Sequence, residues 1–172
     1  ILRYGAGTAS GNWDTTGVIR TVGGAIVNLS NSLIADAFYE GITAYPGGDV
    51  TVSNSIIARA DRGVNSDGSA VVRLTNCTLD ANRIGVWGHS GHLEVQNTVI
   101  ANSLEAGFDN VLNSPFVFRY NNVWSTTGAN YVRVADQTGL NGNVSVDPQF
   151  KDAAGGNYRL RYVSPMIDAA DG

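Results

Sequence analysis

Short alternations of apolar and polar residues run along most of the chain. Val50-Thr51-Val52 and Leu93-Glu94-Val95 alternate with the two-residue period of a β-strand. Val71-Val72-Arg73-Leu74 and Phe116-Val117-Phe118 are β-branched or aromatic runs of strand length. We find no long window with the 3.6-residue apolar stripe of an amphipathic helix. The pattern therefore predicts an all-β chain built from short strands.

This pattern repeats about every 22 residues. A fixed period of that length is the signature of a solenoid, and leucine is too sparse here for a leucine-rich repeat. With three short strands in each unit, the repeat predicts the coils of a parallel β-helix. Two series mark the period. Four glycines each precede an apolar residue, namely Gly41 before Ile42, Gly63 before Val64, Gly85 before Val86 and Gly107 before Phe108. Five asparagines lie in similar phrases, namely Asn31, Asn54, Asn76, Asn97 and Asn121.

The asparagines have a physical reason to recur. Coils of a β-helix stack about 4.8 Å apart, so a residue that recurs once per coil stacks on its own kind. Asparagine tolerates the left-handed conformation of a tight turn, and its amide can both donate and accept. We therefore expect an internal asparagine row that satisfies buried turn groups. Cys77 is the only cysteine and shares a column with Ser32, Ser55 and Thr98, which predicts a small buried thiol, not a nucleophile.

The period also divides the chain. Residues 1–134 are predicted to form about six coils, of which the first, within residues 1–24, is degenerate. Residues 135–172 are predicted to be a C-terminal loop and capping segment of the same domain, with residues 158–168 across the C-terminal end of the solenoid. The N-terminal end has no capping pattern, so we expect weak self-association through Leu2 and Tyr4. The alternative is that a loop at residues 5–17 covers this end with Trp13.

These repeats resemble the right-handed parallel β-helix repeats of the pectate-lyase-like superfamily. The likeness covers residues 24–134, where an apolar strand, an asparagine turn, a second strand and Gly-Ile or Gly-Val follow one another. The tail resembles the ending of many secreted bacterial β-helix proteins, through Asp147-Pro148-Gln149-Phe150, Asn157-Tyr158-Arg159-Leu160 and Ser164-Pro165-Met166-Ile167-Asp168. The resemblance implies an extracellular or cell-surface location in a bacterium.

Composition excludes two classes of partner. The net charge is −4 and no basic cluster is present, which argues against nucleic-acid binding. No apolar stretch is long enough to predict a membrane span.

The strand after each repeated glycine carries the candidate site. If the apolar residue after the glycine points inward, its successors Thr43, Asn65, Trp87 and Asp109 point outward. Two residues later, Tyr45, Asp67 and His89 also face out. An exposed tryptophan beside hydrogen-bonding groups suits a sugar, so the candidate substrate-binding residues are Asn65, Trp87, Tyr45, Arg62 and Arg83. The alternative is an ordinary solvated strand face, because outward positions must hold polar residues of some kind.

The catalytic candidates are Asp67, His89 and Asp109. Pectate-type lyases, which this fold resembles, use a lysine or arginine base with carboxylate-bound calcium, but the one lysine, Lys151, lies outside the coils. Polygalacturonase-like hydrolases carry four motifs, and only Asn65-Ser66-Asp67 and Gly88-His89-Ser90 match two of them. We expect no cofactor and no metal, with calcium at Asp67 and Asp109 as the alternative.

We therefore predict a secreted or surface β-helix module that binds carbohydrate or a partner without catalysis. The alternative is a fragment of a polysaccharide-degrading enzyme, either a lyase or a glycoside hydrolase. Two carboxyl groups about 5–9.5 Å apart would be needed for glycoside hydrolysis.

Overall fold

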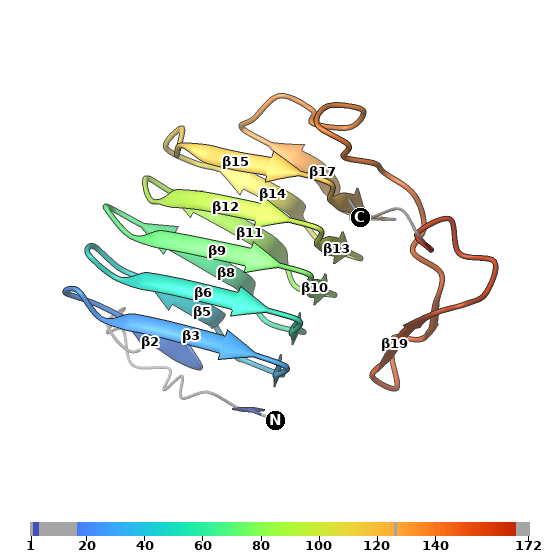
Figure 1. Ribbon diagram of the computed structural model, residues 1–172, viewed down its shortest axis with the longest axis horizontal. Coiled ribbons are helices and arrows are strands. Elements are labelled where there is room, and N and C mark those ends of the chain that lie inside the picture. The colour runs from blue at the N-terminus through green and yellow to red at the C-terminus, as the bar shows by residue number, and fades with distance from the viewer. Residues whose placement is uncertain (1, 4–16, 126, 168–172) are drawn as a thin grey trace.

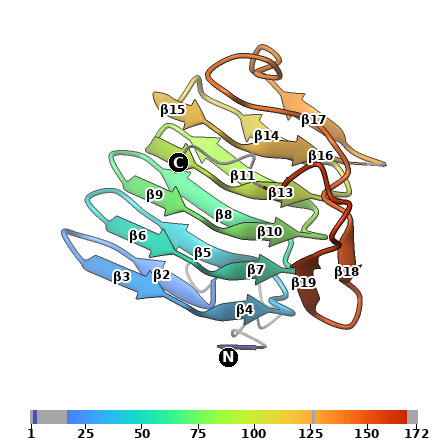
Figure 2. The same ribbon diagram turned by 45° about the vertical axis from the view of Figure 1, so that its right-hand side comes forward.

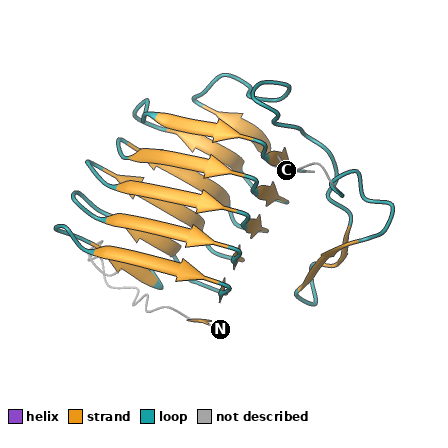
Figure 3. Cartoon of the chain, viewed as in Figure 1, coloured by secondary structure: helices purple, strands orange, loops and turns teal. Residues whose placement is uncertain are grey.

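The short strands of the repeat assemble into three parallel sheets that face one another around a narrow core (Figure 1). The computed structural model describes residues 2–3, 17–125 and 127–167. Each coil adds one strand to each sheet, so the strands run in layers along the molecule and are joined by turns (Figure 3). The prediction of an all-β parallel solenoid of about six coils is confirmed, because two sheets have six strands and the third has five.

We name the sheets A, B and C. Sheet A contains β1 (Leu2–Arg3), β4 (Leu33–Ala35), β7 (Ile56–Ala58), β10 (Thr78–Asp80), β13 (Val99–Ala101) and β16 (Asn122–Trp124). Sheet B contains β2 (Ile19–Thr21), β5 (Glu40–Ala44), β8 (Arg62–Asp67), β11 (Ile84–His89), β14 (Ala106–Asn110) and β17 (Ala129–Val132). Sheet C contains β3 (Ile26–Ser30), β6 (Asp49–Ser53), β9 (Val71–Thr75), β12 (His92–Gln96) and β15 (Phe116–Arg119).

The core forms where the inward positions of the three sheets meet. The residues after the repeated glycines in β5, β8, β11 and β14 are fully buried, as the alternation predicts: Ile42, Val64, Val86 and Phe108. Each pairs with its equivalent in the next coil, so the sequence period and the strand register agree. The outward residues of sheet B are therefore also aligned from coil to coil.

The repeated glycines are explained by the close approach of neighbouring coils. A Cβ atom on Gly85 would lie 2.6 Å from the carbonyl oxygen of Gly107 and 2.5 Å from Ile100. The same conflict recurs in the previous coil, where a Cβ on Gly63 would lie 2.6 Å from the carbonyl oxygen of Gly85. Only glycine fits a column in which each backbone packs this tightly against the next.

We expected the asparagine row to lie inside the solenoid, but four of its five residues do not. Asn31, Asn54 and Asn76 are exposed, Asn97 is half-buried, and all four have positive φ angles near 50°. The amide of Asn76 does donate to Asn54 Oδ1 (3.3 Å), but on the surface. These residues recur because the turn needs a left-handed residue, which asparagine tolerates better than most.

The buried row begins one residue later in the chain. Thr98 Oγ1 accepts a hydrogen bond from the Cys77 amide (3.3 Å), and Asn121 Oδ1 accepts one from the Thr98 amide (3.0 Å). Asn121 joins this row because Tyr120 takes the left-handed turn position in that coil (φ 54°). The internal row was therefore predicted correctly only at Asn121. The predicted burial of Cys77 is confirmed, and this burial raises the pKa of its thiol.

The C-terminal segment has two parts. The Asn121 amide donates to Asn143 Oδ1 (2.9 Å), and Val144 bridges to Asn122, so this stretch continues sheet A beyond β16. The antiparallel pair β18 (Phe150–Asp152) and β19 (Asn157–Leu160) then turns back along the side of the solenoid (Figure 2). Tyr158 in β19 accepts a hydrogen bond from Arg59, which follows β7 (3.3 Å). The expectation that residues 158–168 cross the C-terminal end is therefore wrong for Tyr158.

The residues of the predicted tail motif pack against one another. Ser164 Oγ donates to the carbonyl oxygen of Pro148 (2.7 Å), and the rings of Phe150 and Tyr158 meet edge to face at 5.4 Å. Asp147 Oδ1 accepts from the Gln149 amide (2.8 Å). These contacts give the spaced Asp-Pro, Phe, Tyr and Ser-Pro positions a structural reason, which is to hold the tail together.

At the other end, β1 pairs with β4 and β2 pairs with β5, so a first coil is present. Tyr4 and Trp13 lie outside the described residues, and the side chain of Leu2 is not described. The self-association and the covering loop therefore both stay predictions. Within the described ranges, no helix is long and apolar enough to cross a membrane.

Candidate functional site

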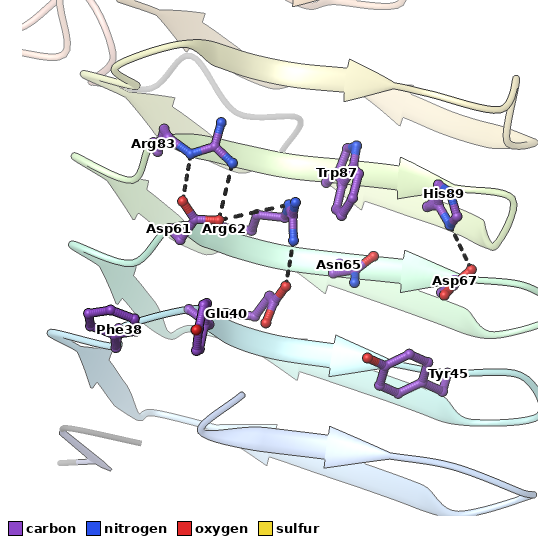
Figure 4. A pocket seen from close by; sticks show the side chains of 11 residues that line it. Phe38, Glu40, Tyr45, Asp61, Arg62, Asn65, Asp67, Arg83, Trp87 and His89 are labelled. Carbon is purple, nitrogen blue, oxygen red and sulfur yellow. Dashed lines mark hydrogen bonds and ion pairs between the residues drawn. The ribbon is translucent and has the colours of Figure 1, made fainter. Parts of the chain in front are cut away.

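A pocket of about 510 Å³ lies on the outer face of sheet B, where β5, β8 and β11 are neighbours (Figure 4). Four aromatic side chains line it, together with three carboxylates, two arginines, an asparagine and a histidine. It contains seven of the eight residues that the sequence singled out: Tyr45, Arg62, Asn65, Asp67, Arg83, Trp87 and His89. The eighth, Asp109, is not among the lining residues.

Strand register brings two of the catalytic candidates together. Asp67 at the end of β8 pairs with His89 at the end of β11. The Nδ1 atom of His89 lies 2.8 Å from Asp67 Oδ1, which is hydrogen-bond distance. The Gly68 amide donates to the carbonyl oxygen of His89 (3.0 Å) and ties the two turns to each other. The carboxylate therefore orients the imidazole and leaves Nε2 as the ring nitrogen available to a ligand.

Trp87 is not the open platform that the sequence suggested. The guanidinium carbon of Arg62 lies 3.3 Å from the centre of the tryptophan ring, and the His89 ring lies 5.3 Å away at an angle of 36°. Figure 4 shows Trp87 between these two side chains. Stacking of this kind covers aromatic surface and holds the arginine in place. The most exposed aromatic ring of the pocket is instead Phe38, at 66%.

Both arginines of the pocket are paired with carboxylates on neighbouring coils. Arg62 Nη1 donates to Glu40 Oε1 (2.6 Å), and Glu40 is only 3% exposed. Arg83 donates to both oxygens of Asp61 (2.5 and 3.1 Å) and also to Glu105. The hydrogen bond to Asp61 is the main reason that the pKa of the Arg83 guanidinium is raised above its ordinary value. These pairs fix the charge pattern of one end of the pocket.

Asp109 and Asp67 are not brought into one site. Asp109 follows Trp87 in its column, one coil further on, and is only 1% exposed. Its Oδ1 accepts a hydrogen bond from Arg133 Nε (2.8 Å), and a second bond joins its Oδ2 to Arg133 Nη2. Asp67 is bonded to His89 instead. Among the residues that the structure describes, no group of three or more histidine, cysteine, aspartate or glutamate side chains could hold a metal ion.

Several buried polar atoms in the pocket wall have unused hydrogen-bonding capacity. Within the described part of the chain, four such atoms have no hydrogen-bond partner: Glu40 Oε2, Arg62 Nε, Asn65 Oδ1 and Trp87 Nε1. Asn65 is 5% exposed, so water reaches it poorly in the absence of a ligand. An unpaired buried polar group costs about 1–3 kcal/mol. A water molecule or a ligand hydroxyl that reached these atoms would recover that loss.

Four lining residues are not among the candidates: Asp61, which precedes Arg62, and Phe38, Tyr39 and Glu40. Phe38 and Tyr39 lie in the turn before β5, and Glu40 is the first residue of β5, where it precedes Gly41 as Arg62 precedes Gly63 in the next coil. The rings of Phe38 and Tyr39 meet edge to face at 4.7 Å, which places an aromatic pair at the margin of the pocket. The available signal was the adjacent Phe-Tyr pair, because the position of Tyr39 holds a charged residue in each of the following coils, namely Asp61, Arg83 and Glu105.

Comparison with protein-family models shows which family this fold belongs to. Residues 8–154 match the model described as a right-handed β-helix region. Neither the curated proteins nor the solved structures gave a significant match. Since the family match spans most of the 172 residues and agrees with the stacked parallel sheets, the chain belongs to the right-handed β-helix family.

Proposed function

We propose that this protein is a β-helix module that binds oligosaccharide in the sheet B pocket without catalysing a reaction. One observation carries the proposal: aromatic side chains border a pocket whose wall also holds buried hydrogen-bonding atoms, among them Asn65 Oδ1 and Trp87 Nε1, that have no partner within the described residues. A sugar ring presents apolar C–H faces together with hydroxyl groups, so it needs both kinds of contact. Such a role places the protein outside the cell or at its surface.

The carboxylates of the pocket support binding more than hydrolysis. A glycoside hydrolase needs two carboxyl groups with access to the scissile bond. Both oxygens of Asp61 accept hydrogen bonds from Arg83, and Glu40 is bonded to Arg62 and almost fully buried. Asp109 is bonded to Arg133 and does not line the pocket. Asp67 is then the carboxylate best placed for chemistry, because the other two carboxylates that line the pocket, Glu40 and Asp61, are paired with arginines.

The test compares two aromatic side chains. Phe38→Ala removes an exposed ring that lines the pocket, whereas Tyr162→Ala removes a ring that is 91% exposed and lies in the tail. Candidate ligands come from a panel of soluble oligosaccharides, and affinities are measured by calorimetry. We expect Phe38→Ala to weaken binding by up to about tenfold, the equivalent of one lost aromatic contact, and Tyr162→Ala to leave it unchanged. Equal affinities for parent and Phe38→Ala would contradict the proposed site.

One observation favours a second candidate function, a polysaccharide-degrading enzyme. The pair of His89 Nδ1 and Asp67 Oδ1 at 2.8 Å is the arrangement in which a carboxylate orients a histidine for proton transfer. The assay is the release of reducing ends or unsaturated products from neutral and acidic polysaccharides. Turnover by the parent that is abolished in Asp67→Asn would replace the binding proposal with the enzyme.

A further inference from the structure

The charges of the sheet B pocket bear on which sugars it can accept. Its lining holds three carboxylates, Glu40, Asp61 and Asp67, and two guanidinium groups, Arg62 and Arg83. A pocket that recognises an anionic sugar needs a cation with free N–H groups directed at the ligand, because such pairs are charge-assisted and often bidentate. Whether the pocket can bind uronic acids therefore depends on whether the protein's own carboxylates leave either guanidinium charge unbalanced.

Each arginine is already committed to protein carboxylates. Arg62 donates to Glu40 (2.6 Å) while its flat face rests on Trp87 (3.3 Å), so the edge and a face of the guanidinium are both in use. Arg83 gives two donors to Asp61 and a third to Glu105. Arg62 Nε has no hydrogen-bond partner within the described residues, but it is buried, and the charges of both guanidinium groups are paired with protein carboxylates.

The remaining groups of the pocket are neutral or negative. Asp67 adds a carboxylate whose Oδ1 atom lies 2.8 Å from His89 Nδ1. Of the unpartnered buried atoms of the pocket, Asn65 Oδ1 and Glu40 Oε2 are acceptors that fit a hydroxyl donor, and Arg62 Nε and Trp87 Nε1 are donors. A ligand carboxylate would lose its hydration shell here and would face three carboxylates, while both guanidinium charges are already paired.

We propose that the pocket selects uncharged sugars and excludes uronic acids; this inference rests on the proposed carbohydrate-binding function. The selection comes from the pairing of Arg62 with Glu40 and of Arg83 with Asp61, which balances the two positive charges and leaves the carboxylate of Asp67 in excess. Discrimination then arises from repulsion and from desolvation that the wrong ligand cannot recover. The ligand class is a neutral oligosaccharide whose hydroxyl groups donate to the wall.

Matched ligands test the inference directly. A neutral glucan is compared with the same glucan oxidised to the uronate at C6, and a highly methyl-esterified pectin with its de-esterified form, by affinity electrophoresis and calorimetry at low salt. We expect binding to at least one neutral member, and binding at least about tenfold weaker to its charged counterpart. Equal or tighter binding of the uronate would overturn the inference and leave the proposed function standing. Binding to none of the four would overturn both.

Two variants test the cause of the discrimination. Glu40→Gln and Asp61→Asn remove the charge that neutralises Arg62 and Arg83, respectively, with little change of shape. Either variant is expected to reduce the ratio of the affinities for the neutral and the charged ligand several-fold, provided that its melting temperature shows an intact fold. Asp49→Asn is the matched control, since it releases Arg73 from an equivalent pair (2.7 Å) on sheet C, away from the pocket. If both folded pocket variants kept the affinity ratio of the parent, the pairing of Arg62 and Arg83 would not be the cause of the discrimination.

Discussion

At the scale of single residues, two neighbouring positions of the turn between sheets C and A have different roles. Asn76 takes the left-handed backbone conformation (φ 55°), and the next residue, Cys77, sends its side chain inward. Asn121 does the inward task in a later coil, where it donates to Val95 O (2.9 Å) and accepts from the Thr98 amide (3.0 Å). An asparagine in this repeat can therefore be important for either of two different reasons.

The two roles predict different costs. Asn121→Ala would leave two buried backbone groups unpaired, at about 1–3 kcal/mol each. Asn76→Ala loses only an exposed amide and places alanine in the left-handed region, which costs roughly 1–2 kcal/mol, and Asn76→Gly should cost less still. Urea unfolding of the three variants measures this order. Asn76→Ala as destabilising as Asn121→Ala would mean that the exposed row, not the buried one, holds the coils together.

At the scale of strands, the glycine column sets how closely coils of sheet B approach. Gly85→Ala is predicted to destabilise the fold, because its Cβ would lie 2.6 Å from a backbone oxygen that cannot move without shifting β14. Overpacking of this kind costs about 1–3 kcal/mol. Thr51→Ala, at an outward position of β6, is the control and should change the free energy of unfolding by far less. A Gly85→Ala variant as stable as the parent would show that the coils can separate locally.

The tail hairpin adds a titratable contact to sheet A. Burial raises the pKa of Asp80 above its ordinary 3.8, while hydrogen bonds from Asn102 and Tyr158 and the charge of Arg59 act the other way. Because the folded pKa exceeds the unfolded one, Asp80 contributes stability that is fully present below the unfolded pKa. That contribution is lost as the pH rises through the folded pKa.

Asp80→Asn removes this dependence. The unfolding free energy of the variant minus that of the parent should therefore increase as the pH rises across roughly pH 3 to 7. Asp136→Asn is expected to show the opposite trend, since the hydrogen bond from the Thr138 amide (2.8 Å) lowers the pKa of Asp136. Urea unfolding at a series of pH values measures both. A difference for Asp80→Asn that stays flat or falls with pH would contradict the burial of this carboxyl group.

At the scale of the whole molecule, arginines join successive coils. Each of five arginines pairs with an acid one coil earlier: Arg59 with Asp36, Arg62 with Glu40, Arg73 with Asp49, Arg83 with Asp61 and Arg133 with Asp109. The planar guanidinium group, unlike the ammonium group of lysine, can pair in a bidentate way with a carboxylate on a neighbouring coil. Partly exposed pairs add little stability, so their contribution is mainly to alignment. This geometry explains why all lysine and arginine positions of the chain except one hold arginine.

The sequence period predicted the strand columns of this fold, but it did not predict how the side chains form the pocket. The period assigns every residue to a column, so the buried Ile42 column and the alignment of Asp67 with His89 followed from counting. The column to which a residue belongs does not determine the direction in which a long side chain extends. Trp87 was expected to be open, and it is covered by Arg62, which comes from a different column of the neighbouring strand. The pocket depends on such diagonal contacts, and on a turn at Phe38 that breaks the repeat.

The central claim is that the sheet B pocket binds a neutral oligosaccharide, and a residue-resolved NMR titration tests it most directly. The indole Nε1–H signal of Trp87 is assigned by its loss in Trp87→Phe and followed together with the backbone amides. We predict saturable shifts at the pocket residues Asn65, Asp67, Trp87 and His89, with no shift on the outer face of sheet C at Thr51, Arg73 and Glu94. Shifts confined to sheet C or the tail, or no shift at any residue with a full panel of neutral oligosaccharides, would contradict the account.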